Sequence, residues 1–273
     1  MILTLVVPTF NEGENTALLV SSVCREMENA GLRDYEILFI DDSTDQTPLL
    51  LARLARENPV VRFLHRSGER GLGTAIVRGF SEARGRIVAV MDGDLQHPPS
   101  LLPAMMAQIE RGADLVVPSR FLPGGSDGGL TLPRKLVSLV ARLIARILLS
   151  RVRPVSDPTG GVFMARREVL EGVVFDAGSW KILIEILVRG CYGRVAEIPY
   201  RFRARDLGTS KMSAAAQMDY LLHLLRLLLG LGPGRRTESC RKRPVFERLS
   251  SGPEETSSSP SRPPQGPTVR HGK

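Results

Sequence analysis

The chain has 273 residues, of which 42% are hydrophobic and 24% charged, and its net charge is +8. These values exclude a chain without a hydrophobic core and predict one large globular domain, alone or with an appendage. The three scattered cysteines form neither a disulfide framework nor a CxxC metal pattern, which favours a reducing cytoplasm.

The first 120 residues of the chain alternate between apolar runs and helical patterns. The N-terminus is apolar only through Val7 and lacks a basic leader, so it predicts a first strand and not a signal peptide. The runs that read as strands are Ile2–Val7, Glu36–Ile40, Val61–Leu64, Ile87–Met91 and Leu115–Pro118. The patterns that read as helices are Glu14–Ala30, Thr47–Glu57, Thr74–Ala83 and Leu101–Arg111.

This alternation predicts an α/β fold with a mainly parallel sheet flanked by helices. The runs stay apolar without a period of two, as strands buried on both faces do. In such sheets ligands bind beyond the carboxyl ends of the strands. Each of the five runs is followed by polar or turn-forming residues, so a site is expected at that edge.

After Arg120 the pattern changes to a Gly-rich loop followed by two apolar helices. The first is expected at Leu136–Ser150 and the second at Ala214–Leu231. Neither offers the roughly 20 uninterrupted apolar residues of a membrane-spanning helix. Each could lie in the membrane interface with Arg side chains reaching the headgroups, or could pack on the domain as core.

From Pro233 the chain becomes rich in Pro, Ser, Gly, Arg and Glu, which predicts a disordered tail. This segment holds nine Lys or Arg against four Glu. Such a basic tail suits an anionic membrane surface or nucleic acid, or is simply solvated. We therefore expect three parts: an α/β domain at 1–212, an amphipathic interface helix at 213–232 and the tail at 233–273.

The stretch VMDGDLQHPP carries the sharpest chemical signal. Asp92 and Asp94 follow a buried strand, and residues two apart on an extended strand point to the same face. Two carboxylates so close are unfavourable unless a cation lies between them. Mg²⁺ or Mn²⁺ would serve, with Gln96 as a further oxygen ligand and a diphosphate-bearing substrate in the shell. The alternative is a polar turn with solvated carboxylates.

Two further strand ends carry polar side chains. Asp41 and Asp42 end the second strand in IDDSTDQT, where an acid could accept hydrogen bonds from a base or ribose. Thr44 and Asp45 are explained by capping of the next helix. In VPTFNE, Phe10 could cover a base and Glu12 could fix a polar edge.

Four cations follow the acidic motif, each near glycines or a helix start. Any of them could be a solvated surface group, but this placement also suits grips on phosphate oxygens. They are Arg120, Arg134, Arg205 and Lys211.

Taken together, these segments resemble the family 2 glycosyltransferases of GT-A fold, and within them the dolichol-phosphate (polyprenol-phosphate) mannosyltransferases. The resemblance runs from about Ile2 to Lys211. The matching pieces are VPTFNE, IDDSTDQT, GLGTAIVRGF, VMDGDLQHPP, PSRF, PRKLVS, DPTGGVFMARREV, WKILIEILVRG and RFRARDLGTSK.

The resemblance implies roles for the marked residues. Asp92, Asp94 and Gln96 would hold the metal, with Gly93 lining the sugar side. Arg120 and Arg134 would hold the lipid phosphate, and Arg205 and Lys211 the diphosphate. The nucleotide pocket would consist of Pro8, Phe10, Glu12, Ile40 and Asp42.

The activity implied is inverting transfer of mannose from GDP-mannose to dolichyl or polyprenyl phosphate, dependent on Mg²⁺ or Mn²⁺. The expected setting is peripheral, on the cytoplasmic face of a membrane, with a possible membrane partner subunit and without nucleic acid. A runner-up is a UDP-sugar-dependent glucosyl- or aminosugar-phosphate lipid synthase. From outside enzymology, the alternative is a catalytically idle membrane adaptor.

Overall fold

We describe a computed structural model of the chain, which covers residues 1–128, 132–176, 181–203, 214–231 and 244–250. One sheet of eight strands runs in the order β3-β2-β1-β4-β6-β5-β7-β8. The strands are β1 Leu3–Thr9, β2 Tyr35–Asp41, β3 Val61–His65, β4 Ile87–Val90, β5 Leu115–Ser119, β6 Phe163–Arg166, β7 Arg194–Pro199 and β8 Val245–Arg248. The helices are α1 Gly13–Asn29, α2 Thr47–Glu57, α3 Leu72–Glu82, α4 Leu101–Glu110, α5 Leu132–Leu148, α6 Arg167–Leu170, α7 Ile182–Arg189 and α8 Ala214–Leu228.

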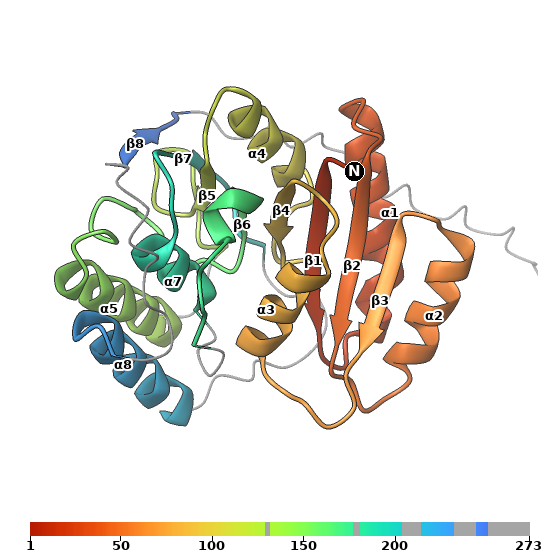
Figure 1. The fold of residues 1–273 in the computed structure, drawn as a ribbon, viewed down its shortest axis with the longest axis horizontal. Helices are drawn as coiled ribbons and strands as arrows, with labels where there is room; N and C mark the ends of the chain where they lie inside the picture. The colour runs from red at the N-terminus through yellow and green to blue at the C-terminus, as the bar shows by residue number, and fades with distance from the viewer. Residues whose placement is uncertain (129–131, 177–180, 204–213, 232–243, 251–273) are drawn as a thin grey trace, which may run out of the picture.

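Helices cover both faces of the sheet, as the continuous apolar runs require (Figure 1). Successive residues of β1 point to opposite faces, so Leu5 and Val7 join one core and Val6 the other. The core around Leu5 contains side chains of α1, α2 and α4, whereas the core around Val6 contains those of α3, α5, α7 and α8. The predicted α/β sheet with flanking helices is confirmed.

β6 is the strand that breaks the parallel order. It runs antiparallel to β4 and to β5, with Phe163 opposite Val90. The other pairs, β1 with β2 and β4, β2 with β3, β5 with β7, and β7 with β8, are all parallel. The start of β6 therefore lies at the edge where β4 ends, and the loop that enters β6 meets the acidic motif there.

The two apolar helices of the C-terminal half, α5 and α8, pack beside each other (Figure 1). Tyr220 of α8 donates a hydrogen bond to the carbonyl of Ala141 in α5, at 2.8 Å. Within the described residues, no helix has the length and apolar character needed to cross a bilayer.

Two expectations need correction. The tail expected to be disordered from Pro233 contains β8, which pairs with β7 at the edge of the sheet. The four residues of β8 lie in a polar, Pro-rich context, and the neighbouring strand supplies their hydrogen bonds. In addition, Cys191 takes part in a disulfide, while Cys24 is a free thiol.

Candidate active site

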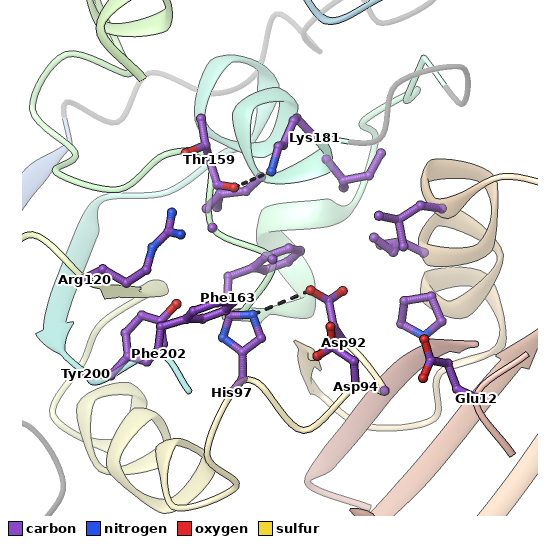
Figure 2. A pocket seen from close by; sticks show the side chains of 18 of the residues that line it. Glu12, Asp92, Asp94, His97, Arg120, Thr159, Phe163, Lys181, Tyr200 and Phe202 are labelled. Carbon is purple, nitrogen blue, oxygen red and sulfur yellow. Dashed lines mark hydrogen bonds and ion pairs between the residues drawn. The ribbon is translucent and has the colours of Figure 1, made fainter. Parts of the chain in front are cut away.

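A cleft of about 400 Å³ opens at the carboxyl ends of β1 and β4 (Figure 2). The residues that line it come from both halves of the chain. They are Pro8, Phe10, Glu12, Leu72, Ile76, Asp92, Gly93, Asp94, His97, Arg120, Thr159, Gly160, Gly161, Phe163, Lys181, Ile182, Leu183, Tyr200 and Phe202.

The acidic wall of the cleft follows β4 and the end of β1. Figure 2 shows the carboxylates of Asp92 and Asp94 on the side of the cleft where Glu12 lies. Leu95 adopts a left-handed backbone conformation with φ 60°, which turns the chain sharply after Asp94. The Asp94 carboxylate accepts a hydrogen bond from the backbone N–H of Gln96 at 3.2 Å. Both residues line the same cleft. They lie in the turn that follows β4 at Val90, and not on the extended strand from which the spacing of two predicts a shared face.

The loop entering β6 closes tightly on this wall. A Cβ placed on Gly161 would lie 2.4 Å from Oδ2 of Asp92, closer than real Cβ contacts come. Glycine at this position therefore lets the backbone approach the carboxylate. The neighbouring Gly160 has ordinary room, because a Cβ there would come no closer than 3.5 Å to the Asp157 carbonyl.

His97 approaches the same carboxylate of Asp92. Its Nε2 lies 3.6 Å from Oδ2 of Asp92, and its ring packs against Tyr200 and Phe202 at centroid distances of 5.5 and 5.1 Å. The side chain is buried, and Nδ1 has no hydrogen-bond partner among the described residues. The two aromatic rings thus fix a histidine that points at the acidic motif.

Arg120 stands on the opposite, cationic wall (Figure 2). Its Nε and Nη2 donate to the two oxygens of the fully buried Asp157, at 2.7 and 3.0 Å. Burial opposes the charge, but this bidentate pairing outweighs it and raises the pKa of Arg120 above its ordinary value. The guanidinium is therefore charged and held in one orientation.

Lys181 is the second cation of this wall. It precedes α7, and its Nζ donates to the carbonyl of Thr159 at 2.5 Å. Burial, followed by repulsion from Arg120, lowers the pKa of Lys181 to about 8, although Asp92 and Asp157 act in the other direction. Two cations thus face two carboxylates across one cleft.

The predicted nucleotide pocket is only partly assembled in the cleft. Pro8, Phe10 and Glu12 line the cleft. Ile40 is fully buried inside the sheet. Asp42 forms a bidentate pair with Arg66 at 2.7 and 2.6 Å and accepts the N–H of Gly71 at 3.1 Å. Contact of Ile40 and Asp42 with a nucleotide stays a prediction.

The adjacent carboxylates of the second strand end have separate partners in the fold. Asp41 pairs with His65 at 2.7 Å and accepts the hydroxyl of Ser43 at 2.5 Å, while Asp42 pairs with Arg66. Asp45 accepts the N–H of Thr47 at 2.9 Å, as capping of α2 predicts. His65 and Arg66, at the end of β3, thus balance the two adjacent carboxylates of Asp41 and Asp42, which capping of α2 does not explain.

The remaining predicted residues lie outside the cleft lining or outside the description. The Gln96 amide donates to the carbonyl of Arg203 at 3.2 Å, so its role as a metal ligand stays a prediction. Arg134 is in the first turn of α5, but its side chain is not described. Arg205 and Lys211 lie outside the described residues.

Several residues of the cleft, together with the partner of Arg120, belong to the matching segments, although the sequence predicts no role for them. His97 belongs to DGDLQHPP, Asp157 and Gly161 to DPTGGVF, and Lys181 to WKILIEILVRG. The signal was present in the motif, but a role follows only when the fold shows which side chain faces the cleft. Phe202 belongs to RFRARDLGTSK, whereas Tyr200 lies outside the matching segments.

The chain is similar to known proteins along most of its length. The family model described as glycosyl transferase family 2 matches residues 4–174. A dolichol-phosphate mannosyltransferase of Pyrococcus furiosus is 39% identical over 84% of this chain, and the match spans 64% of that relative's length. A protein of the same name from Mycosarcoma maydis is 34% identical over 82% of this chain and 78% of its own.

Solved structures share the fold. Mannosyl-3-phosphoglycerate synthase from Rubrobacter xylanophilus superposes with a TM-score of 0.67 at 21% identity, over 84% of this chain and 74% of that one. A mannosyltransferase from Pyrobaculum calidifontis, solved in complex with GDP-Man and Mn²⁺, gives a TM-score of 0.51 at 18% identity, over 85% and 65%. From its sequence, its fold and the family model that matches it, the chain belongs to glycosyl transferase family 2.

Proposed function

We propose that this chain transfers mannose from GDP-mannose to dolichyl or polyprenyl phosphate and inverts the anomeric centre. The observation that carries the proposal is the pairing of two walls: Asp92 and Asp94 face Arg120 and Lys181 across one cleft. This pairing suits a reaction between two phosphate-bearing substrates. The donor diphosphate would bind a dication held by the carboxylates, and the acceptor phosphate would bind the two cationic side chains. The names of the relatives support mannose and a lipid phosphate as the groups transferred and accepted.

Asp92 and Asp94 fit a hard divalent cation such as Mg²⁺ or Mn²⁺. Both are carboxylates at one strand end, and Gly161 leaves the space that Asp92 occupies. When bound, the ion would stabilise negative charge on the leaving diphosphate. The GDP-Man and Mn²⁺ in the Pyrobaculum calidifontis structure support this choice.

The cationic wall would receive the acceptor phosphate. Because Asp157 already orients the Arg120 guanidinium, little side-chain freedom is lost when it binds an anion. An ionised phosphate is already a nucleophile, so no side chain has to remove its proton. A phosphate oxygen then forms a bond to the anomeric carbon, and the bond from that carbon to the diphosphate oxygen breaks. The nucleoside diphosphate departs with the bonding electrons.

Membrane contact is proposed through α5 and α8. Large apolar side chains on these helices are exposed, among them Leu136 at 62%, Leu143 at 52% and Ile147 at 62%. Two arginines of α5 have partners within the fold: Arg142 donates to the carbonyl of Ser156 and lies over the Phe121 ring, and Arg146 donates to the carbonyl of Arg153. The proposal therefore rests on the exposed apolar side chains of α5 and α8. This face would hold the enzyme at the level of a lipid phosphate.

A donor panel tests the proposal. The full chain is incubated with GDP-mannose, UDP-glucose or UDP-GlcNAc, with Mn²⁺ and with vesicles that contain dolichyl phosphate. We expect a lipid-linked mannosyl phosphate from GDP-mannose and no product from the UDP-sugars, and no product from any donor without dolichyl phosphate. If a UDP-sugar gives product and GDP-mannose does not, the donor assignment is wrong. If mannose is transferred to water and not to dolichyl phosphate, the acceptor assignment is wrong.

A further inference from the structure

The C-terminal strand β8 contacts a buried carboxylate, Glu197 of β7, which lies between β8 and the active site. β8 adds to the edge of the sheet beside β7, with Arg248 opposite Glu197. Nε of Arg248 lies 3.3 Å from Oε2 of Glu197, and Nη2 donates to the carbonyl of Pro154 at 2.7 Å. Arg248 is half exposed, whereas Glu197 is fully buried. A buried carboxylate needs such partners to remain charged.

Glu197 in turn holds Ser156. One carboxylate oxygen, Oε1, accepts both the backbone N–H of Ser156 at 2.7 Å and its hydroxyl at 2.5 Å. A hydroxyl has one proton, so the 2.6 Å contact between the Ser156 and Ser119 hydroxyls has Ser119 as donor. The charge of Glu197 therefore sets the direction of both hydroxyl hydrogen bonds.

The two serines are the residues directly before the two members of the cleft's ion pair. Ser119 precedes Arg120, and Ser156 precedes Asp157. A hydrogen bond between the serines therefore ties together the two backbone positions from which Arg120 and Asp157 extend. All of these groups except Arg248 are largely buried, so a shift at one is transmitted to the next by close packing.

We propose that Arg248 is a positioning residue for Arg120 and that it acts through Glu197 and Ser156. In this role β8 is a part of the active-site framework, although it lies at the outer edge of the sheet. The inference rests on the proposed function in one respect: it assumes that Arg120 binds the acceptor phosphate.

The same strand offers a matched control. Glu247 of β8 forms an ion pair with Arg194 of β7, and both side chains are about 40% exposed. Loss of this pair would weaken the attachment of β8 without touching Glu197. Glu247→Ala therefore separates a general effect of the strand from the specific path through Arg248.

The test compares initial rates of the full chain and its variants, with GDP-mannose and dolichyl phosphate varied separately. We expect Arg248→Ala to raise the KM for dolichyl phosphate about fivefold or more, while the KM for GDP-mannose changes less than twofold. Arg248→Lys should restore most of the loss, because the ammonium can still meet Glu197. Glu247→Ala should match the wild type in both constants.

A double-mutant cycle tests the path itself. In Glu197→Gln the buried charge is gone, so adding Arg248→Ala should change the acceptor KM by less than twofold. If the two substitutions act additively, or if Arg248→Ala behaves like Glu247→Ala, the positioning role is wrong. If the wild type fails to use dolichyl phosphate, the proposed function fails instead, and the two failures are thereby distinguished.

Discussion

The two walls of the cleft differ in how the chain builds them. The acidic wall comes from one short stretch, because Asp92 and Asp94 both follow β4, and Glu12 joins them from the end of β1. The cationic wall is assembled from distant segments: Arg120 after β5, Asp157 before β6 and Lys181 before α7. Two carboxylates that would bind one dication can come from neighbouring positions, as Asp92 and Asp94 do. The guanidinium of Arg120, in contrast, is oriented by Asp157, which comes from a distant part of the chain.

The acidic wall should be the more sensitive to loss of one charge. Asp94→Ala is expected to lower mannose transfer by at least about 100-fold, because it removes a ligand for the ion that stabilises the leaving group. Binding of Mn²⁺, followed by electron paramagnetic resonance, should weaken in parallel. Glu110→Ala, on the exposed end of α4, is the control. Full activity of Asp94→Ala, or of enzyme treated with EDTA, would refute the metal assignment.

The close approach of the loop before β6 to the Asp92 carboxylate can be tested with two adjacent glycines. Gly161→Ala forces a Cβ onto the Asp92 carboxylate, while Gly160→Ala has room for it. We expect Gly161→Ala to raise the Mn²⁺ concentration for half-maximal activity about tenfold, since displaced support of a ligand costs about that much. Gly160→Ala should stay within about twofold of the wild type. Equal behaviour of the two variants would mean that the loop does not set the position of Asp92.

The cationic wall should respond to pH through Lys181. Its pKa of about 8 lies below the ordinary value, so the ammonium is charged at pH 7 and largely neutral at pH 9. We expect kcat/KM for dolichyl phosphate to fall about tenfold over that interval as this charge is lost. Lys181→Met should have a low value that no longer depends on pH there. A variant with the wild-type pH profile would assign the titration to another group.

The smallest effect on the chemistry is expected from the apolar face of α5. Leu143→Glu with Ile147→Glu should reduce binding to phospholipid vesicles about tenfold or more, because each side chain loses favourable burial. Transfer to a short, water-soluble prenyl phosphate should change less than about twofold, because both residues lie outside the cleft. Vesicle binding equal to that of the wild type would place the membrane contact elsewhere.

The sequence predicted the elements of the first half of the fold closely. In the second half it predicted the two apolar helices, found as α5 and α8, but none of the strands. Helix α2 has the predicted bounds Thr47–Glu57, and the first five strands lie within about two residues of the predictions. β6, β7 and β8 were not predicted. β6 and β8 have four residues each, so neither shows enough periodicity to stand out, and both are defined by the strands beside them.

The site divides in the same way. Asp92 and Asp94 could be predicted as neighbours in one site because they follow the same buried strand, although a turn and not an extended strand places them at the cleft. The ion pair of Arg120 with Asp157 could not, since the partners are 37 positions apart and meet only through the fold. Asp42 carried a nucleotide-binding prediction, yet a bidentate pair with Arg66 already occupies its carboxylate. Neither tertiary partner can be read from local sequence.

The reversed direction of β6 has a consequence for how this fold can change. In a parallel sheet only the segments that leave strands reach the ligand edge, and each must lead on to a crossover helix. Here a segment that enters a strand reaches the same edge, carrying Thr159, Gly160 and Gly161. The ligand edge therefore holds side chains from a segment that belongs to no crossover, and a substitution in that segment leaves the crossover helices in place.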